Sequence, residues 1–154
     1  MSLTLTLLPA AIALSTTLTS SAVGVLTSLE LKDGCPDLPA VDTAFLDGAL
    51  LLQTLQEHGF SVNKVSEEEY TVQTEAGFLR YFRTASDRPF QVEASRIKDP
   101  NGLLHSLDLL ENEYGRNVQR FTYETIRCNL EQHGMRLESE EVLEDDTILL
   151  TIDL

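Results

Sequence analysis

The chain has 154 residues, which is enough for one domain whose core needs neither disulfides nor metal ions. It carries 25 acidic and 11 basic residues, and its formal net charge of -14 at pH 7 would repel a phosphate backbone, so nucleic acid is excluded as the expected partner. The two cysteines, Cys35 and Cys128, lie far apart in the sequence without the spacing of metal ligands, so neither a disulfide framework nor a zinc site is predicted.

The N-terminal segment from Met1 to Leu29 contains no charged side chain, and residues 3–26 are long enough to cross a bilayer as a helix. Hydroxyl side chains and Pro9 weaken the preference of this segment for hydrocarbon. The tripeptide Ser20-Ser21-Ala22 suits a signal cleavage site, but no basic residue comes before Lys32. A membrane-associated helix and a removed signal therefore both stay open.

A third alternative is that this segment docks on the domain or on another protein. From Leu3 to Leu7 leucine alternates with threonine, which is the period of a half-buried strand, whereas residues 10–14 favour a helix. We therefore expect a change of structure near Pro9. The sequence does not choose among the three alternatives.

Residues 31–40, which include Cys35-Pro36, have the composition of a linker. They divide the chain into an apolar N-terminal segment at residues 1–30 and a single domain at residues 41–154. Any membrane contact would come from residues 3–26, so we expect a cytoplasmic protein that is either free or membrane-associated.

Two passages of this domain, Ala49 to Val62 and Glu124 to Leu137, align without a gap. Each begins with the apolar periodicity of a helix and reaches a His-Gly pair, at His58-Gly59 and His133-Gly134. Glycine suits the left-handed conformation just past a helix end because it lacks a Cβ atom. Apolar and polar residues alternate after each glycine, which predicts a strand with one buried face.

Both predicted strands lead into an acidic turn, Glu67-Glu68-Glu69 in the first copy and Glu144-Asp145-Asp146 in the second. A second strand follows each turn, at Tyr70 to Thr74 and at Thr147 to Asp153. The order helix, strand, turn, strand thus occurs twice. Because such units cannot bury their apolar faces alone, we expect both helices to pack against one antiparallel sheet.

Between the two copies the sequence predicts two further strands, Phe78 to Phe82 and Phe90 to Ala94, joined by a polar turn. An apolar-rich helix follows from Leu103 and leads through Gly115 into the second copy, and the sequence does not decide whether this glycine separates two helices or kinks one. The predicted fold class is α+β, with an antiparallel sheet packed by helices, two helix–strand–strand units with intervening strands, and the apolar N-terminal segment in front.

The C-terminal third carries a familiar pattern: Glu113-Tyr114-Gly115, the helix end Leu130 to Gly134, and the hairpin Glu140 to Leu150. It resembles the hypothetical chloroplast reading frame thirty-five family of cyanobacteria, plastids and some other bacteria, a domain of unknown function. The resemblance covers about Phe45 to Leu154 and rests on a pattern without catalytic residues. The turn differs, because Asp145-Asp146 stands where an Asp-Gly pair is usual.

Members of this family are similar in being encoded near AAA-type ATPases. The resemblance therefore implies an adaptor or substrate-linked role beside such an ATPase. It implies no catalytic, cofactor-binding or metal-binding residue. The uncharged segment Met1 to Leu29 is an addition to the family pattern.

The residues that suggest metal binding have structural explanations. His58 and His133 occupy the same place in the repeat, where an imidazolium would interact favourably with the helix C-terminus and its free carbonyls. The remaining histidine is His105, so no metal site is predicted. Three acidic clusters lack the order of a calcium loop and are interpreted as solvated turns beside strand edges. These clusters are Glu67 to Glu69, Asp108 to Glu113 and Glu138 to Asp146.

No nucleophile motif, phosphate-binding glycine loop or dinucleotide fingerprint occurs in the sequence, and Ser95 and Tyr123 have no assigned base. No catalytic or cofactor-binding residue is predicted. The basic residues gather at four arginines, which we expect to pair with Glu75 or Glu93 across the sheet, the alternative being a docking surface for an acidic partner. These are Arg80, Arg83, Arg88 and Arg96.

An absent active site beside an apolar segment favours a non-catalytic protein-binding or adaptor protein, whose partner is another protein. The alternative is a small enzyme or ligand-binding domain with an unrecognised pocket between sheet and helices. The sequence does not identify the partner or the oligomeric state.

Overall fold

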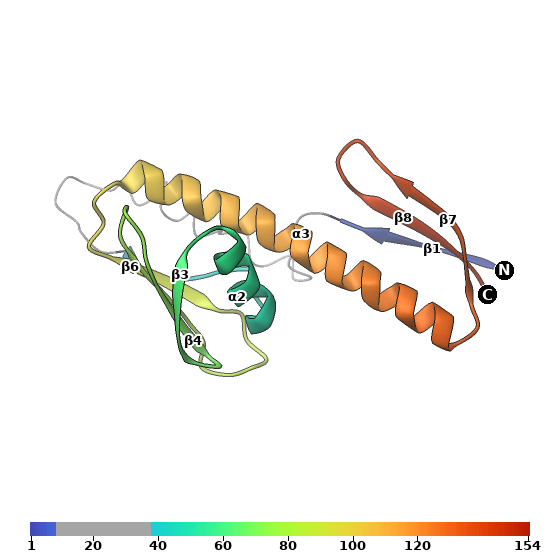
Figure 1. Ribbon diagram of the computed structural model, residues 1–154, viewed down its shortest axis with the longest axis horizontal. Coiled ribbons are helices and arrows are strands. Elements are labelled where there is room, and N and C mark those ends of the chain that lie inside the picture. Colours follow the sequence, from blue (N-terminus) through green and yellow to red (C-terminus); the bar gives the residue numbers. More distant parts are fainter. Residues whose placement is uncertain (9–37) are drawn as a thin grey trace. The chain divides into compact units, whose positions relative to one another are not determined.

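The computed structural model describes residues 1–8 and 38–154 (Figure 1). This part of the chain holds two helices and two antiparallel sheets, which confirms the predicted α+β class. The chain folds as two compact units. One contains the described residues 38–114, and the other contains residues 1–8 and 115–154.

The first unit is built on a five-stranded antiparallel sheet with the order β2-β6-β5-β4-β3. The predicted strands are all present, and β2 begins at Leu38, inside the segment predicted to be a linker. Its strands are β2 (Leu38–Asp42), β3 (Ser61–Ser66), β4 (Glu69–Gln73), β5 (Phe78–Phe82) and β6 (Gln91–Ser95).

Alternating side chains give this sheet one buried face. Tyr70, Tyr81 and Val92 lie opposite one another on β4, β5 and β6, and all three are fully or almost fully buried. The helices supply the rest of this core with apolar residues at helical spacing. These are Leu51 and Leu55 of one helix and Leu103, Leu107, Leu110 and Tyr114 of the other.

Helix α2 (Gly48–Glu57) begins where the Asp47 side chain accepts a hydrogen bond from the backbone N–H of Leu50. The chain leaves the helix through the C-cap His58 and then Gly59, which has a φ of +95°. The backbone N–H of Gly59 donates to Gln56 and that of Phe60 donates to Leu55, at 3.0 and 3.2 Å. These two bonds define a Schellman motif.

Helix α3 (Pro100–Gln132) ends in the same way, at Gly134 with a φ of +67°. The N–H of Gly134 donates to Glu131 and that of Met135 donates to Leu130, at 3.3 and 2.9 Å. Both His-Gly pairs thus close a helix with the same two hydrogen bonds, as the sequence alignment requires. The helix runs through Gly115 without a break, so this glycine does not separate two helices.

The second unit holds a three-stranded antiparallel sheet with the order β1-β8-β7, beside the residues of α3 from Gly115 onward. Its strands are β1 (Ser2–Leu7), β7 (Arg136–Val142) and β8 (Ile148–Asp153). Leu150 and Ile152 of β8 are buried, and Leu5 and Leu3 of β1 lie opposite them. The Leu-Thr alternation of the N-terminus therefore does form a strand that docks on the protein.

The expectation of one sheet for both repeat units is wrong. The second strand of each repeat, β4 or β8, has the first strand of its own hairpin on one side and a different third strand on the other. In the first unit that third strand is β5, and in the second it is β1, antiparallel in both cases. Two sheets form because each hairpin pairs with its own third strand. In the second unit β1 occupies the position that β5 occupies in the first.

Residues 9–37 lie outside the described residues, and with them most of the segment 3–26 and the signal-like tripeptide at 20–22. Residues 2–7 form a strand, so this end of the segment does not form the start of a membrane helix at Leu3. In residues 1–8 and 38–154, neither helix is both long and apolar enough to span a bilayer.

The turn between β7 and β8 holds Asp146 in a conformation that favours glycine. Asp146 has a φ of +64°, a left-handed conformation that costs an L-residue free energy. Replacing Asp146 with Gly is expected to raise the free energy of unfolding by about 0.5–1 kcal/mol, because glycine adopts this conformation without a Cβ clash. Urea denaturation measures the change. Gly134→Asp, which makes the reverse substitution at a left-handed position, should destabilise the chain; equal effects of both substitutions would contradict the explanation.

Candidate functional site

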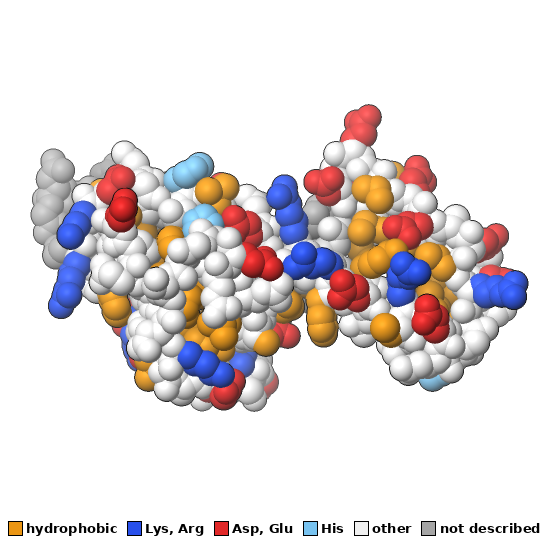
Figure 2. All heavy atoms as spheres, in the orientation of Figure 1, with side chains coloured by type: hydrophobic (Ala, Val, Ile, Leu, Met, Phe, Trp, Pro, Cys, Tyr) orange, Lys and Arg blue, Asp and Glu red, His pale blue; other side chains and the backbone are white. Residues whose placement is uncertain are grey.

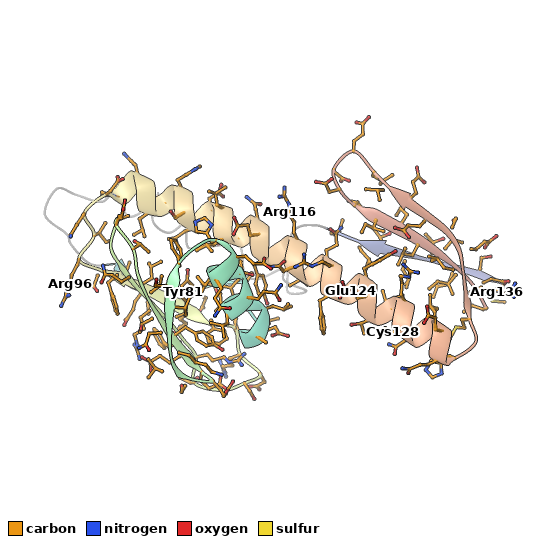
Figure 3. The ribbon with its side chains drawn as sticks, viewed as in Figure 1. Tyr81, Arg96, Arg116, Glu124, Cys128 and Arg136 are labelled. Carbon is orange, nitrogen blue, oxygen red and sulfur yellow. The ribbon has the colours of Figure 1, made fainter. Side chains whose placement is uncertain are left out.

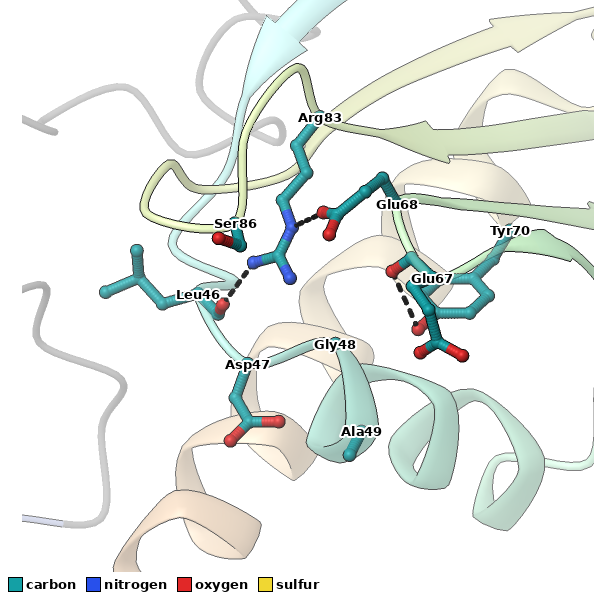
Figure 4. A pocket seen from close by; sticks show the side chains of 9 residues that line it. All are labelled: Leu46, Asp47, Gly48, Ala49, Glu67, Glu68, Tyr70, Arg83 and Ser86. Atoms are coloured by element: carbon teal, nitrogen blue, oxygen red, sulfur yellow. Dashed lines mark hydrogen bonds and ion pairs between the residues drawn. The ribbon is translucent and has the colours of Figure 1, made fainter.

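A cavity of about 370 Å³ opens at the N-terminus of α2 (Figure 4). The loop before α2, the β3–β4 turn and the segment after β5 surround it. Its lining residues are Leu46, Asp47, Gly48, Ala49, Glu67, Glu68, Tyr70, Arg83 and Ser86. Carboxylates outnumber the single arginine here, so the lining does not suit an anion.

Arg83 crosses this cavity, and its Nε and Nη1 donors are engaged within the unit. Its Nε donates to the carboxylate of Glu68, and its Nη1 donates to the carbonyl of Leu46 at 2.6 Å. The guanidinium lies 4.3 Å from the centre of the Phe90 ring, and the side chain is only 9% exposed. Arg83 therefore connects the β3–β4 turn, the loop before α2 and the residue that precedes β6.

Arg80 lies on the face of the five-stranded sheet opposite the buried one. It contacts Glu69 at 2.8 Å and Glu93 at 2.9 Å, and its guanidinium stacks 4.2 Å from the Phe82 ring centre. The predicted pairing with Glu93 is confirmed, and Glu69 takes the place predicted for Glu75. Exposed pairs of this kind contribute well under 1 kcal/mol each, so they shape the surface more than they stabilise it.

The two matched histidines differ in their surroundings. The His58 imidazole Nδ1 lies 3.1 Å from the carboxylate of Glu113 on α3 and packs edge-on against Phe60. His58 is the C-cap residue of α2, as predicted, but its ring pairs with the Glu113 carboxylate and not with the helix carbonyls, because a carboxylate is the stronger partner. His133 and His105 are exposed. Within the described residues, no group of three His, Cys, Asp or Glu side chains could hold a metal ion.

The acidic clusters are used for contacts within each unit. Glu67 pairs with Lys64 at 2.6 Å, while Glu68 and Glu69 serve the two arginines described above. In the second unit, the carboxylate of Glu140 accepts a hydrogen bond of 2.7 Å from the Tyr123 hydroxyl. Acidic side chains spread over the β7–β8 hairpin in Figure 2, so the outer strand β7 presents a charged edge.

Cys128 and Ser95 show no arrangement for nucleophilic catalysis. Cys128 is an exposed thiol on the second half of α3 (Figure 3). Ser95 is the last residue of β6, opposite Phe78. Cys35 lies outside the described residues. Neither described side chain has a hydrogen-bonded base, within residues 1–8 and 38–154, that would activate it.

The free edge of β1 differs from the other sheet edges that the structure describes. Leu154 donates a backbone hydrogen bond to the carbonyl of Met1, so Met1 and Leu154 are a hydrogen-bonded pair. In an antiparallel ladder such pairs alternate, which directs the backbone groups of Leu3, Leu5 and Leu7 toward β8. The N–H and C=O groups of the residues between them point to the open side of the strand.

No charged side chain of residues 1–8 protects this edge. The residues whose backbone groups face outward are Ser2, Thr4 and Thr6, and all three are exposed. The sequence does not predict this edge, because a strand at residues 3–7 is one of three alternatives there and the sequence does not show that it pairs with β8. The hydroxyl residues at every second position were the available signal.

Protein-family models, curated proteins and solved structures yield no match to this chain. The described residues define an α+β protein with two antiparallel sheets, one of which has an uncharged open edge. The resemblance to the chloroplast reading frame thirty-five family stays a prediction.

Proposed function

We propose that this chain is a non-catalytic protein-binding protein, which holds its partner by accepting an extended strand at the outer edge of β1. The observation that carries the proposal is the row of outward backbone groups at Ser2, Thr4 and Thr6, on a strand that has no charged side chain of its own. Unpaired strand edges bind extended segments through main-chain hydrogen bonds.

The other edge of the same sheet supports this choice. The outer strand β7 carries Arg136, Glu138, Glu140 and Glu141, and such charges oppose strand addition. The alternative function, an enzyme or a ligand-binding domain, would use the cavity at the start of α2. Its arginine is engaged internally and its remaining charges are carboxylates, so that alternative has less support.

A proline at Thr4 tests the proposal. The N–H of Thr4 faces outward, so Thr4→Pro removes an outward donor and blocks the edge while leaving the β1–β8 hydrogen bonds in place. Thr4→Val keeps the N–H and is the matched control. We expect proteins captured from cell extract by the wild-type chain and by Thr4→Val to be lost with Thr4→Pro.

The captured partner is then purified and added to the labelled chain. Slower amide exchange at Thr4 and Thr6 is the expected result, because strand addition protects outward N–H groups. Capture that is unchanged by Thr4→Pro would show that the partner binds elsewhere. The family resemblance makes an AAA-type ATPase one candidate among the captured proteins.

A further inference from the structure

We infer that the strand accepted by β1 is the β1 strand of a second copy of this chain, paired antiparallel and centred on Thr4. The two three-stranded sheets would then form one six-stranded sheet across a twofold axis. This inference rests on the proposed function, since it names the partner that the open edge takes.

The hydrogen-bonding phase of β1 fixes which register works. Outward groups belong to Ser2, Thr4 and Thr6, so a partner strand must place its own outward residues opposite them. Antiparallel pairing centred on Thr4 sets Thr4 against Thr4 and Ser2 against Thr6 of the second copy. Every outward N–H and C=O of both strands then has a partner, without any residue beyond Leu7.

The side chains fit the same register. Residues 1–7 read apolar, hydroxyl, apolar, hydroxyl, apolar, hydroxyl, apolar, and this order is the same in both directions from Thr4. On the face that bears Leu150, Leu3 of one copy lies opposite Leu5 of the other. On the other face hydroxyl side chains meet, and Thr pairs are favourable neighbours across antiparallel strands.

Burial and charge favour the same partner. Leu3 is 45% exposed although it lies opposite the buried Ile152, so a neighbouring strand would cover apolar surface that is now open. No charged side chain occurs in residues 1–8, although the Glu138 carboxylate accepts a hydrogen bond of 2.9 Å from the Ser2 hydroxyl. At its centre, Thr4 against Thr4, this edge therefore brings two copies together with less repulsion than their net charge of -14 each implies. Self-pairing at β7 would bring Glu138, Glu140 and Glu141 of two copies together.

Sedimentation velocity over a concentration series tests the inference on the full chain at high salt, where the repulsion between copies is screened. The expected result is a concentration-dependent dimer for the wild-type chain and for Thr4→Val, and a monomer for Thr4→Pro with an unchanged circular dichroism spectrum. A wild-type monomer at every concentration overturns the second-copy inference, and so does a dimer that persists in Thr4→Pro.

Crosslinking gives a second measurement that does not depend on the proline variant. Cysteine replaces Thr4 or Thr6, one at a time, in a chain whose Cys35 and Cys128 are serine. Hydrogen-bonded partners have Cα atoms about 5.5 Å apart, within reach of a disulfide. Thr6 faces Ser2 of the second copy, so two Thr6 positions are offset by roughly 13 Å along the strands.

Oxidation is expected to convert Thr4→Cys to a covalent dimer far faster than Thr6→Cys. Equal crosslinking of the two variants, or none, overturns the register centred on Thr4. The proposed function fails separately, because it requires that Thr4→Pro loses captured protein. A monomeric wild-type chain that still loses captured protein upon Thr4→Pro would therefore leave protein binding standing and reject only the second copy.

Discussion

Replacing Tyr114 with Phe is expected to lower the free energy of unfolding of the first unit by about 1–3 kcal/mol. The Tyr114 hydroxyl oxygen accepts hydrogen bonds from the backbone N–H groups of Leu46 and Asp47, at 3.1 and 3.0 Å. Both donors lie at the entrance to α2, and Tyr114 is 2% exposed. Without the oxygen these two donors lose their partner in a partly buried place, which adds a desolvation cost to the loss of the hydrogen bonds.

Tyr81→Phe is the matched control, since Tyr81 is also a buried tyrosine of the same unit (Figure 3). Its hydroxyl has no hydrogen-bond partner among the described residues, and burial raises the pKa of Tyr81, so the phenol stays neutral. Removing this hydroxyl should leave stability unchanged or increase it by up to about 1 kcal/mol. Thermal and urea denaturation measure both variants, and similar losses for the two would show that the Tyr114 hydrogen bonds are not the cause.

Local signals in the sequence predicted the helix ends and the strands of the repeat, but the buried face expected for the strand after each glycine is wrong, because β3 and β7 are largely exposed. Gly59 and Gly134 mark two Schellman motifs because only glycine adopts a left-handed backbone without strain, and the alternating pattern that follows each forms a strand. Leu55 and Leu130 occupy the same repeat position and both are buried. These features depend on neighbours a few residues away, which a single sequence displays.

Contacts between distant residues were not predictable from the same signals. The Tyr114 hydroxyl accepts hydrogen bonds from Leu46 and Asp47, which are distant in the sequence. The His58 ring contacts the carboxylate of Glu113 and not the carbonyls at the end of α2. The choice of a third strand for each hairpin is equally non-local. Alternation indicated a strand at residues 3–7, but only pairing with β8 shows which of its backbone groups remain open.

Deleting residues 1–8 is expected to unfold the three-stranded sheet while the five-stranded sheet stays folded. The deletion removes the hydrogen-bonded pairs of β1 with β8 and uncovers Leu150 and Ile152, which are 0% and 3% exposed. At roughly 1 kcal/mol for each of the lost hydrogen bonds, the loss is on the order of 5 kcal/mol. The remaining two-stranded hairpin then depends on its packing against α3 alone, because an isolated hairpin is marginal in water.

Hydrogen exchange resolves the two sheets. Amides of β7 and β8 should lose protection, whereas those of β4 and β5 should keep it. A synthetic peptide of residues 1–8 added to the deleted chain is expected to restore protection in β8, and the same peptide with proline at Leu5 should not, because the Leu5 N–H faces β8. Full protection of β8 without β1 would contradict its role as the counterpart of β5. Rescue by the peptide would show that a separate chain can add a strand to this sheet. Strand addition is also the interaction that we propose between the open edge of β1 and its partner.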